Sequence, residues 1–319
     1  MNAFVQTVTG KVPVESIQIA DGHEHVWINP ADGISDDARI ELNDFQRIRQ
    51  ELRSFKQAGG TLLVDCQPGG AGRDTRQLRR LSQETGVLIT ATTGTHQRKY
   101  YPADSWQWRA DTDEAARYFV RELTEGTQES MGEQGENAAS EPVRAAVIKI
   151  GYEGTIEGQT QVLMEAAAIA SRQTGASILF HTEMGSNIEA LLPFFEMHGV
   201  PPTRLYMCHV DKRPDVGLHR ELAQAGVLLG YDTFGRPKYD PDHNVWQLIP
   251  TLIADGLAHA IAICLDFAFP SQWRSFGGEP GLTFLQSHIL PRLTEMGLDM
   301  ATIKRLTAQN VAERLAWNQ

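Results

Sequence analysis

The stretch Ile17-Gln18-Ile19-Ala20-Asp21-Gly22-His23-Glu24-His25-Val26 runs from an alternating apolar segment directly into two histidines. Side chains on a β-strand alternate between two faces, so His23 and His25 would leave the same face together. Two imidazoles at the end of a strand can hold one divalent cation. Chance alone produces such a pair in roughly one of three chains with ten histidines. The interpretation therefore depends on the residues at the ends of the later strands.

A short apolar run followed by an amphipathic stretch recurs along the 319 residues. Strands are predicted at residues 17–25, 61–67, 87–93, 145–151, 177–182, 205–210, 227–232 and 260–266. Helices are predicted near 44–57, 73–85, 112–125, 159–174, 187–198, 215–225, 244–255, 284–296 and 299–316. Eight apolar strands, each followed by a helix, are typical of a parallel sheet covered on both faces. We predict an α/β fold, a (β/α)8 TIM barrel, in preference to an open doubly wound sheet, because no GxGxxG follows the first strand.

The alternation is interrupted once, at residues 125–142, which are polar, acidic and poor in apolar side chains. We predict a solvated loop there, before the fourth strand. Because strands and helices alternate again directly after it, we expect a single domain over residues 1–319.

Composition excludes several classes of partner. The net charge of −11 argues against a protein that binds nucleic acid by neutralising phosphates. No run of 18 apolar residues is long enough for a membrane span, and no secretory signal is recognisable at the N-terminus. Three cysteines without a CxxC motif suit reduced, buried thiols in a cytoplasmic protein.

Residues that can bind metal follow several of the predicted strands. They are His23 and His25 after the first strand, Lys149 in the fourth, His181 after the fifth, His209 after the sixth and Asp266 after the eighth. In a TIM barrel the active site lies at these carboxyl ends. Each residue alone is more often structural, but their shared position indicates a metal site that binds a small-molecule substrate.

Lys149 interrupts the apolar strand Val147-Ile148-Lys149-Ile150. A buried ammonium group is costly unless it is paired. Either a neighbouring carboxylate pairs with Lys149, or its deprotonated amine takes up CO2 and becomes a carbamate that offers two oxygens to metal ions. The residues alone leave both alternatives open.

Five stretches carry a resemblance to a known family: DGHEH, VIKIGYEG, HTEMG, CHVDK and ICLDFAF, in this order. As a set they resemble the phosphotriesterase family of the amidohydrolase superfamily over nearly the whole chain. The resemblance implies a hydrolase with two divalent metal ions per chain, usually zinc, bridged by a hydroxide and by Lys149 carboxylated by CO2. A homodimer is expected from the resemblance alone.

The resemblance also implies a role for each of the other strand-end residues. His23, His25 and Asp266 would bind the more buried metal. His181 and His209 would bind the more exposed one. Asp266 would in addition take the proton of the attacking hydroxide and relay it outward.

The substrate implied by the resemblance is a lactone. The tract 209–215 with Tyr231-Asp232 and Lys238-Tyr239 is similar to a branch of sugar-lactone hydrolases, in which Lys238 matches a phosphate-binding lysine. Phe269 and Gln272, however, stand where that branch has an arginine and a tyrosine. We therefore predict a lactonase for a sugar-acid or related lactone. Hydrolysis of organophosphates or phosphorylated lactones is the first alternative, and a metal-binding or ligand-binding barrel without turnover is the second.

Four residues are predicted to contact the substrate: Lys238, Arg274, Tyr100 and Glu183. Three further basic residues lie on the expected rim: Lys212, Arg213 and Arg236. These charges either form a positive local field that suits an anionic or polyhydroxylated substrate, or are solvated loop charges. Tyr100 would hydrogen-bond a lactone oxygen, and Glu183 would reach a sugar hydroxyl. Three tryptophans are candidates for an apolar wall: Trp106, Trp108 and Trp273.

Overall fold

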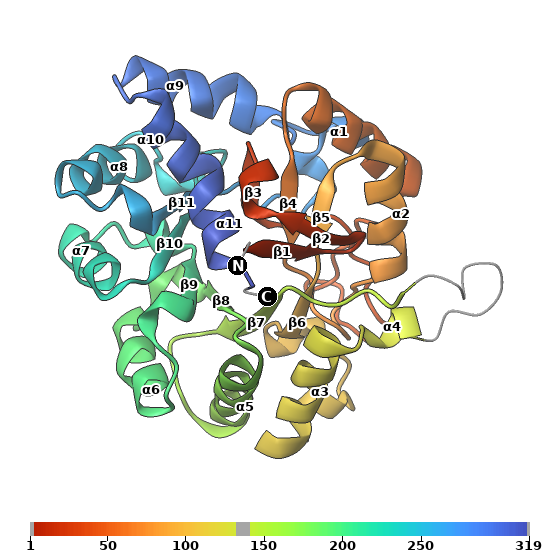
Figure 1. Cartoon of the computed structure of the whole chain (residues 1–319). Helices are drawn as coiled ribbons and strands as arrows, with labels where there is room; N and C mark the ends of the chain where they lie inside the picture. The colour runs from red at the N-terminus through yellow and green to blue at the C-terminus, as the bar shows by residue number, and fades with distance from the viewer. Residues whose placement is uncertain (1–2, 132–140, 318–319) are drawn as a thin grey trace.

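In the computed structural model, which describes residues 3–131 and 141–317, parallel strands run around a barrel and helices cover its outside (Figure 1). The strands are β3 (Ala20–Glu24), β4 (Leu62–Asp65), β5 (Leu88–Thr90) with β6 (Thr92–Thr95), β7 (Val147–Tyr152), β8 (Ile178–Thr182), β9 (Leu205–Cys208), β10 (Leu228–Tyr231) and β11 (Ile261–Ile263). Their positions match the eight predicted strands, and the (β/α)8 barrel is confirmed.

The sheet changes partners at Ala91, which separates β5 from β6. β5 pairs with β4 and β6 pairs with β7, so the third predicted strand joins two sheets, β3-β4-β5 and β6 to β11. The last strand meets the first where the Asp266 N–H donates to the His23 carbonyl at 2.9 Å. Two carboxylates reinforce this seam: Asp21 accepts from the Leu265 N–H at 3.2 Å, and Glu24 accepts from the Phe267 N–H at 2.8 Å.

The outer helices are α1 (Phe45–Gln57), α2 (Thr75–Thr85), α3 (Thr112–Thr124), α5 (Gly158–Thr174), α6 (Leu191–Met197), α7 (Val216–Ala225), α8 (Val245–Ala254) and α9 (Leu290–Glu295). Aspartates cap several amino ends: Asp44, for example, accepts from two backbone N–H groups of α1. Gly175, with a φ of 80°, ends α5 in the left-handed conformation that favours glycine. Within the described ranges, no helix combines the length and the apolar composition that crossing a membrane requires.

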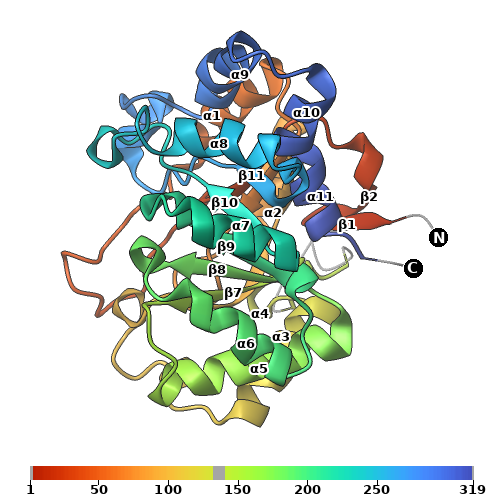
Figure 2. The ribbon, with the colours of Figure 1, turned by 90° about the vertical axis from the view of Figure 1, so that its left-hand side faces the viewer.

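The predicted last helix is divided into α10 (Met300–Lys304) and α11 (Asn310–Arg314) by a π-helical turn at Arg305–Gln309. An N-terminal hairpin that the sequence analysis missed, β1 (Phe4–Thr7) with β2 (Gly10–Pro13), meets the C-terminal segment through a Phe4–Trp317 bridge. Figure 2 shows both chain ends on the same side of the barrel. They lie near the starts of the strands, because the Trp317 ring N–H donates to the carbonyl of Ala146, just before β7.

The prediction of a loop over residues 125–142 is wrong for part of that range. A short helix, α4 (Gln128–Met131), forms there because Glu129 pairs with buried Arg73 at 2.7 Å. Arg73 also pairs with buried Glu122 at 2.6 Å. Residues 132–140 lie outside the described residues.

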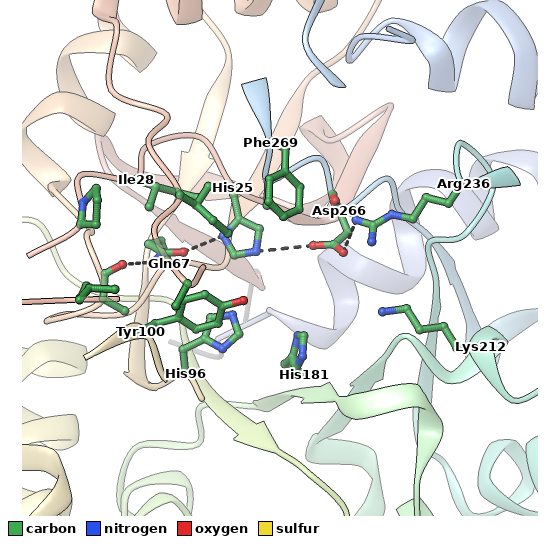
Figure 3. A pocket seen from close by; sticks show the side chains of 16 residues that line it. His25, Ile28, Gln67, His96, Tyr100, His181, Lys212, Arg236, Asp266 and Phe269 are labelled. Atoms are coloured by element: carbon green, nitrogen blue, oxygen red, sulfur yellow. Dashed lines mark hydrogen bonds and ion pairs between the residues drawn. The ribbon is translucent and has the colours of Figure 1, made fainter. Parts of the chain in front are cut away.

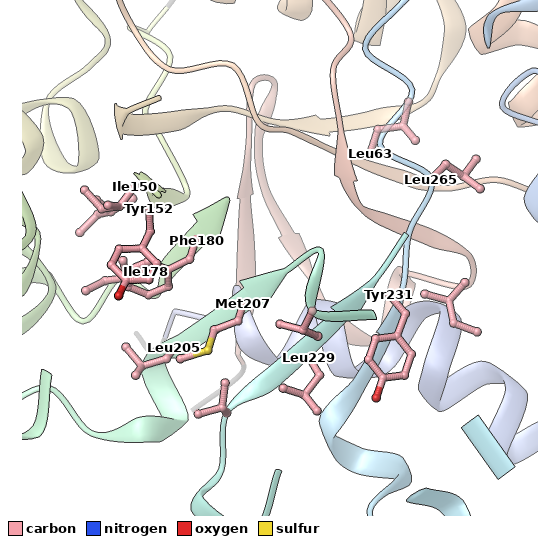
Figure 4. Packing of buried hydrophobic residues seen from close by; sticks show 14 of the residues in the cluster. Leu63, Ile150, Tyr152, Ile178, Phe180, Leu205, Met207, Leu229, Tyr231 and Leu265 are labelled. Atoms are coloured by element: carbon pink, nitrogen blue, oxygen red, sulfur yellow. The ribbon is translucent and has the colours of Figure 1, made fainter. Parts of the chain in front are cut away.

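The strands bury apolar side chains on both faces. Figure 4 shows part of the outer layer, between strands and helices, to which Ile150, Phe180 and Met207 belong. The inner layer fills the barrel and includes Val147 and Leu179. Full burial of such aliphatic side chains contributes roughly 1.5–3 kcal/mol each. The two layers also establish which strand residues face the interior.

Candidate metal centre and active site

Alternation along β7 and β8 places Lys149 and His181 inside the barrel. Each follows an inner-layer residue, Val147 or Leu179, by two positions and therefore points the same way. Lys149 is completely buried and His181 is partly buried. Among the described residues, the ammonium nitrogen of Lys149 has no hydrogen-bond partner.

His23, His25 and Asp266 converge at the seam between β3 and β11. The register between β3 and β4 shifts between Asp21 and Glu24, and such an irregularity can re-aim side chains. The Nε2 atoms of His23 and His25 lie 3.6 and 3.5 Å from one carboxylate oxygen of Asp266. The three residues form a group that could hold a metal ion.

His209 joins this group to His181. The Nδ1–H of His209 donates to Asp232 at 2.8 Å, and the backbone N–H of His209 donates to the same carboxylate at 3.0 Å. This arrangement leaves Nε2 of His209 as an acceptor, which lies 2.9 Å from Nδ1 of His181. Asp232 also lies 3.7 Å from His23, and these two residues with His209 form a second group that could hold a metal ion.

Burial keeps three of the site histidines neutral. It lowers the pKa of His23 to about 3, and burial followed by the charge of nearby Lys149 lowers the pKa of His25. The pKa of His181 is well below its usual value, because of burial and then because of His209. Neutral imidazole is the form that binds metal ions.

Asp266 remains ionised in the same surroundings. Burial alone would raise its pKa, but the positive charge of Arg236, with a hydrogen bond to His25, holds the pKa well below the usual range. The Arg236 guanidinium lies 2.5 Å from the Asp266 carboxylate. A buried anion among neutral imidazoles is suited to binding a cation or accepting a proton.

Two candidate ligands have strained backbones. His209 and Asp266 have φ values of 65° and 55°, in the left-handed region that residues other than glycine rarely adopt. Such strain costs about 1–3 kcal/mol per residue and persists where the surroundings enforce it.

His219 of α7 forms hydrogen bonds with the loop that carries His209. Nε2–H of His219 donates to the carbonyls of Val210 and Arg213, both at 3.0 Å, and Nδ1 accepts from the Tyr231 hydroxyl at 2.8 Å. Burial lowers the pKa of His219 to about 4. The neutral ring therefore connects this loop to α7 and β10.

A pocket of about 670 Å³ opens above these residues, with His25, His181 and Asp266 in its lining (Figure 3). Its other polar lining residues include Gln67, His96, Tyr100, Lys212 and Arg236. Its apolar wall includes Ile28, Ile34, Ile40 and Phe269. A pocket with such a mixed apolar and polar lining is typical of a small-molecule site.

Of the four predicted substrate contacts, only Tyr100 lines this pocket. The other three do not line it, because different partners hold these side chains, and their contact with a substrate stays a prediction. Lys238 lies over the ring of Tyr239 at 4.8 Å, and Arg274 pairs with Glu279 at 3.1 Å. Glu183 accepts from Gln97 at 2.9 Å and lies beside His181.

The rim and wall of the pocket also differ from those predicted. Lys212 and Arg236 do line the pocket, whereas Arg213 pairs with Glu189 at 2.9 Å. The three tryptophans are absent from its lining, and Trp273 is fully buried. Isoleucines from the segment after β3 form the wall in their place.

Asp232 is the main site residue that the sequence analysis did not select. The available signal was its position at the end of the seventh predicted strand, 227–232, where the other candidates were found on their own strands. The isoleucines of the wall carried no comparable signal, because they lie in an irregular segment.

Comparison with known proteins identifies relatives over the full chain. The model of the phosphotriesterase family matches residues 3–315. A protein from Mycoplasmopsis synoviae named phospho-furanose lactonase is 28% identical and covers 100% of this chain and 93% of its own. The crystal structure of an amidohydrolase from Mycoplasma synoviae has a TM-score of 0.90 at 27% identity, over 100% of this chain and 93% of that one. A lactonase from Listeria monocytogenes shares the fold, with a TM-score of 0.88 at 23% identity over 99% of this chain and 100% of that one.

Proposed function

The chain belongs to the phosphotriesterase family, and we propose that it is a metal-dependent hydrolase that opens a lactone. The observation that carries this proposal is the convergence of His23, His25, His209 and Asp266 beside one pocket. The name of the Mycoplasmopsis relative, a phospho-furanose lactonase, supports the substrate class.

We further propose two divalent metal ions, zinc in the native protein, and a carboxylated Lys149. The residues fit this cofactor: within the described part of the chain, Lys149 Nζ and both ring nitrogens of His23 are buried without hydrogen-bond partners. Carboxylation would replace an unpaired buried cation by an anion that offers two oxygens. Such a metal pair supplies Lewis acidity and lowers the pKa of bound water.

The residues of the chain then account for the proton transfers. Water adds to the lactone carbonyl carbon, and the ionised carboxylate of Asp266 takes the released proton. The bond between the carbonyl carbon and the ring oxygen breaks, and both electrons remain on that oxygen. The proton from Asp266 completes the new hydroxyl group, so the product is the open hydroxy acid.

A lactone derived from a sugar acid is the proposed substrate, and a phosphorylated lactone is the second candidate. The second is favoured by the name of the relative and by Lys212 in the pocket lining. Two features argue against a phosphate group: the apolar wall, in which Phe269 is half exposed, and the pairing of Arg236 with Asp266.

Hydrolysis of a substrate panel by protein loaded with zinc tests this proposal. The panel contains a sugar lactone, its phosphorylated form, an aliphatic lactone and an organophosphate triester, followed with a pH indicator. We expect kcat/KM to be highest for a lactone, by orders of magnitude over the triester. A preference for the triester would overturn the lactonase, and binding of metal without any hydrolysis would favour a barrel without turnover.

We also propose a cytoplasmic location and a homodimer. Cys66, Cys208 and Cys264 are all free and buried, which supports a reducing compartment. Light scattering coupled to size exclusion would measure the mass of the assembly, and a monomer at micromolar concentration would contradict the dimer.

A further inference from the structure

The end of β6 and the segment that follows it lie directly on the strand that carries Lys149. Gly94 has a φ of 96°, and a Cβ atom there would overlap the Lys149 carbonyl oxygen. A Cβ atom on Gly151 would come within 2.6 Å of the Gln97 backbone nitrogen. Two glycines therefore permit this close approach, which brings His96 to the pocket beside the candidate metal ligands.

The ring of His96 is fixed in one tautomer. The Gln97 backbone N–H donates to Nδ1 of His96 at 2.7 Å, so Nδ1 is an acceptor and the ring proton is on Nε2. In the neutral ring, Nε2–H is then the only donor. His96 is 5% exposed and lines the pocket.

Neighbouring groups hold the backbone around His96 and pack against its ring. The backbone N–H of His96 donates to the Tyr101 hydroxyl at 2.9 Å, and the Gln97 side chain donates to Glu183 at 2.9 Å. Ring centroids of Tyr100 and His181 lie 4.5 and 4.8 Å from that of His96. A donor held in this way loses little entropy when it binds a substrate atom.

We propose that Nε2–H of His96 donates a hydrogen bond to the ring oxygen of the lactone as that oxygen leaves. This inference rests on the proposed function. Figure 3 shows His96 and Tyr100 on one side of the pocket, and Asp266 with Arg236 across from them. A carbonyl carbon attacked beside Asp266 would direct its leaving oxygen toward His96.

The step balances without any further reactant. As the bond to the carbonyl carbon breaks, the electron pair moves to the ring oxygen, and the His96 hydrogen bond stabilises the developing negative charge. The proton that Asp266 took from water then completes the hydroxyl group, and His96 keeps its own proton. The hydrogen bond therefore matters most when the leaving oxygen is strongly basic.

Two lactones with different leaving oxygens test the inference. An aliphatic lactone expels a basic alkoxide, whereas dihydrocoumarin expels a weakly basic phenolate. For His96→Phe loaded with zinc, we expect kcat/KM on the aliphatic lactone to fall about 10²-fold, the usual effect of removing one such donor, and to change little on dihydrocoumarin. His96→Gln, which keeps an N–H donor, is expected to recover part of the loss.

Metal content and thermal unfolding of each variant exclude a structural effect. His243→Phe, at an exposed histidine outside the pocket lining, is the matched control for the substitution, and Tyr100→Phe removes the other donor on the same side of the pocket. Equal losses on both lactones, no loss on either, or loss of metal from His96→Phe would overturn the inference. So would a selective loss on the aliphatic lactone in Tyr100→Phe alone. If the parent protein binds metal but opens neither lactone, the proposed function itself fails.

Discussion

Replacing Asp232 by asparagine tests whether this carboxylate orients His209. One oxygen of Asp232 accepts from the His209 backbone N–H at 3.0 Å and lies 2.7 Å from ring Nδ1, and the other oxygen lies 2.8 Å from the same Nδ1. An amide offers only one oxygen, so its NH2 group would face one of these two donors. A buried donor left without an acceptor costs about 1–3 kcal/mol.

The loss extends to metal binding, because His209 needs a fixed ring to present Nε2. Removing a carboxylate that orients a histidine ligand typically lowers metal affinity 10–100-fold, which is about 1.4–2.7 kcal/mol. For Asp232→Asn we therefore expect zinc affinity to fall within this range, and the metal-free protein to lose about 1–3 kcal/mol of unfolding free energy.

Competition with a fluorescent chelator measures the affinity, and urea unfolding in EDTA measures the stability. Asp215→Asn is the control: it removes the same charge from the same region, and asparagine caps α7 as well as aspartate does. Unchanged zinc affinity in Asp232→Asn, or an equal loss in Asp215→Asn, would refute the reasoning. A loss far beyond 100-fold would mean that Asp232 binds the metal directly.

Three further predictions concern buried ionisable side chains. Lys149→Ala should lose metal and activity, with partial rescue by short-chain carboxylic acids; metal analysis that finds the parental content would contradict a bridging role. His219 has its folded pKa lowered to about 4 from 6.5, so its contribution to stability is complete above pH 6.5 and is lost as the pH falls toward 4, by about 3 kcal/mol. Urea unfolding across this range should show a shallower pH dependence in His219→Gln, and an identical slope would be inconsistent with the assignment. Arg73→Met should cost about 3–5 kcal/mol in the same assay at pH 7, because it leaves Glu122 and Glu129 without their cation; a loss below 1 kcal/mol would show that the pair is dispensable.

The barrel and the floor of its pocket could be predicted because both depend on local periodicity. Apolar runs of strand length predict that Lys149 and His181 face the same way as the inner-layer residues two positions before them. The carboxyl ends of parallel strands meet at one mouth of the barrel. His209 and Asp266 follow from the same rule. Their left-handed backbone conformations do not, because such conformations are imposed by the surroundings.

The upper part of the pocket depends on contacts that sequence patterns do not encode. The wall comes from an irregular segment that folds back through a bridge between Ile28 and Leu42. Lys238 and Arg274 have the right charge for an anionic substrate, but a ring and a carboxylate hold them elsewhere. The charge of the rim residues can therefore be predicted from the sequence. The direction in which their side chains point cannot, because it depends on contacts with residues elsewhere in the chain.

The seam between β3 and β11 has a consequence for synthesis. Asp21 and Leu265, which meet there, are 244 residues apart, so a ribosome that adds about 5–20 residues per second needs roughly 10–50 s to deliver the second after the first. During that interval the nascent chain carries His23 and His25 but has no Asp266 to complete their set. Metal binding by all three residues is thus possible only after Asp266 has been synthesised, and a chain that stops before β11 cannot assemble this group.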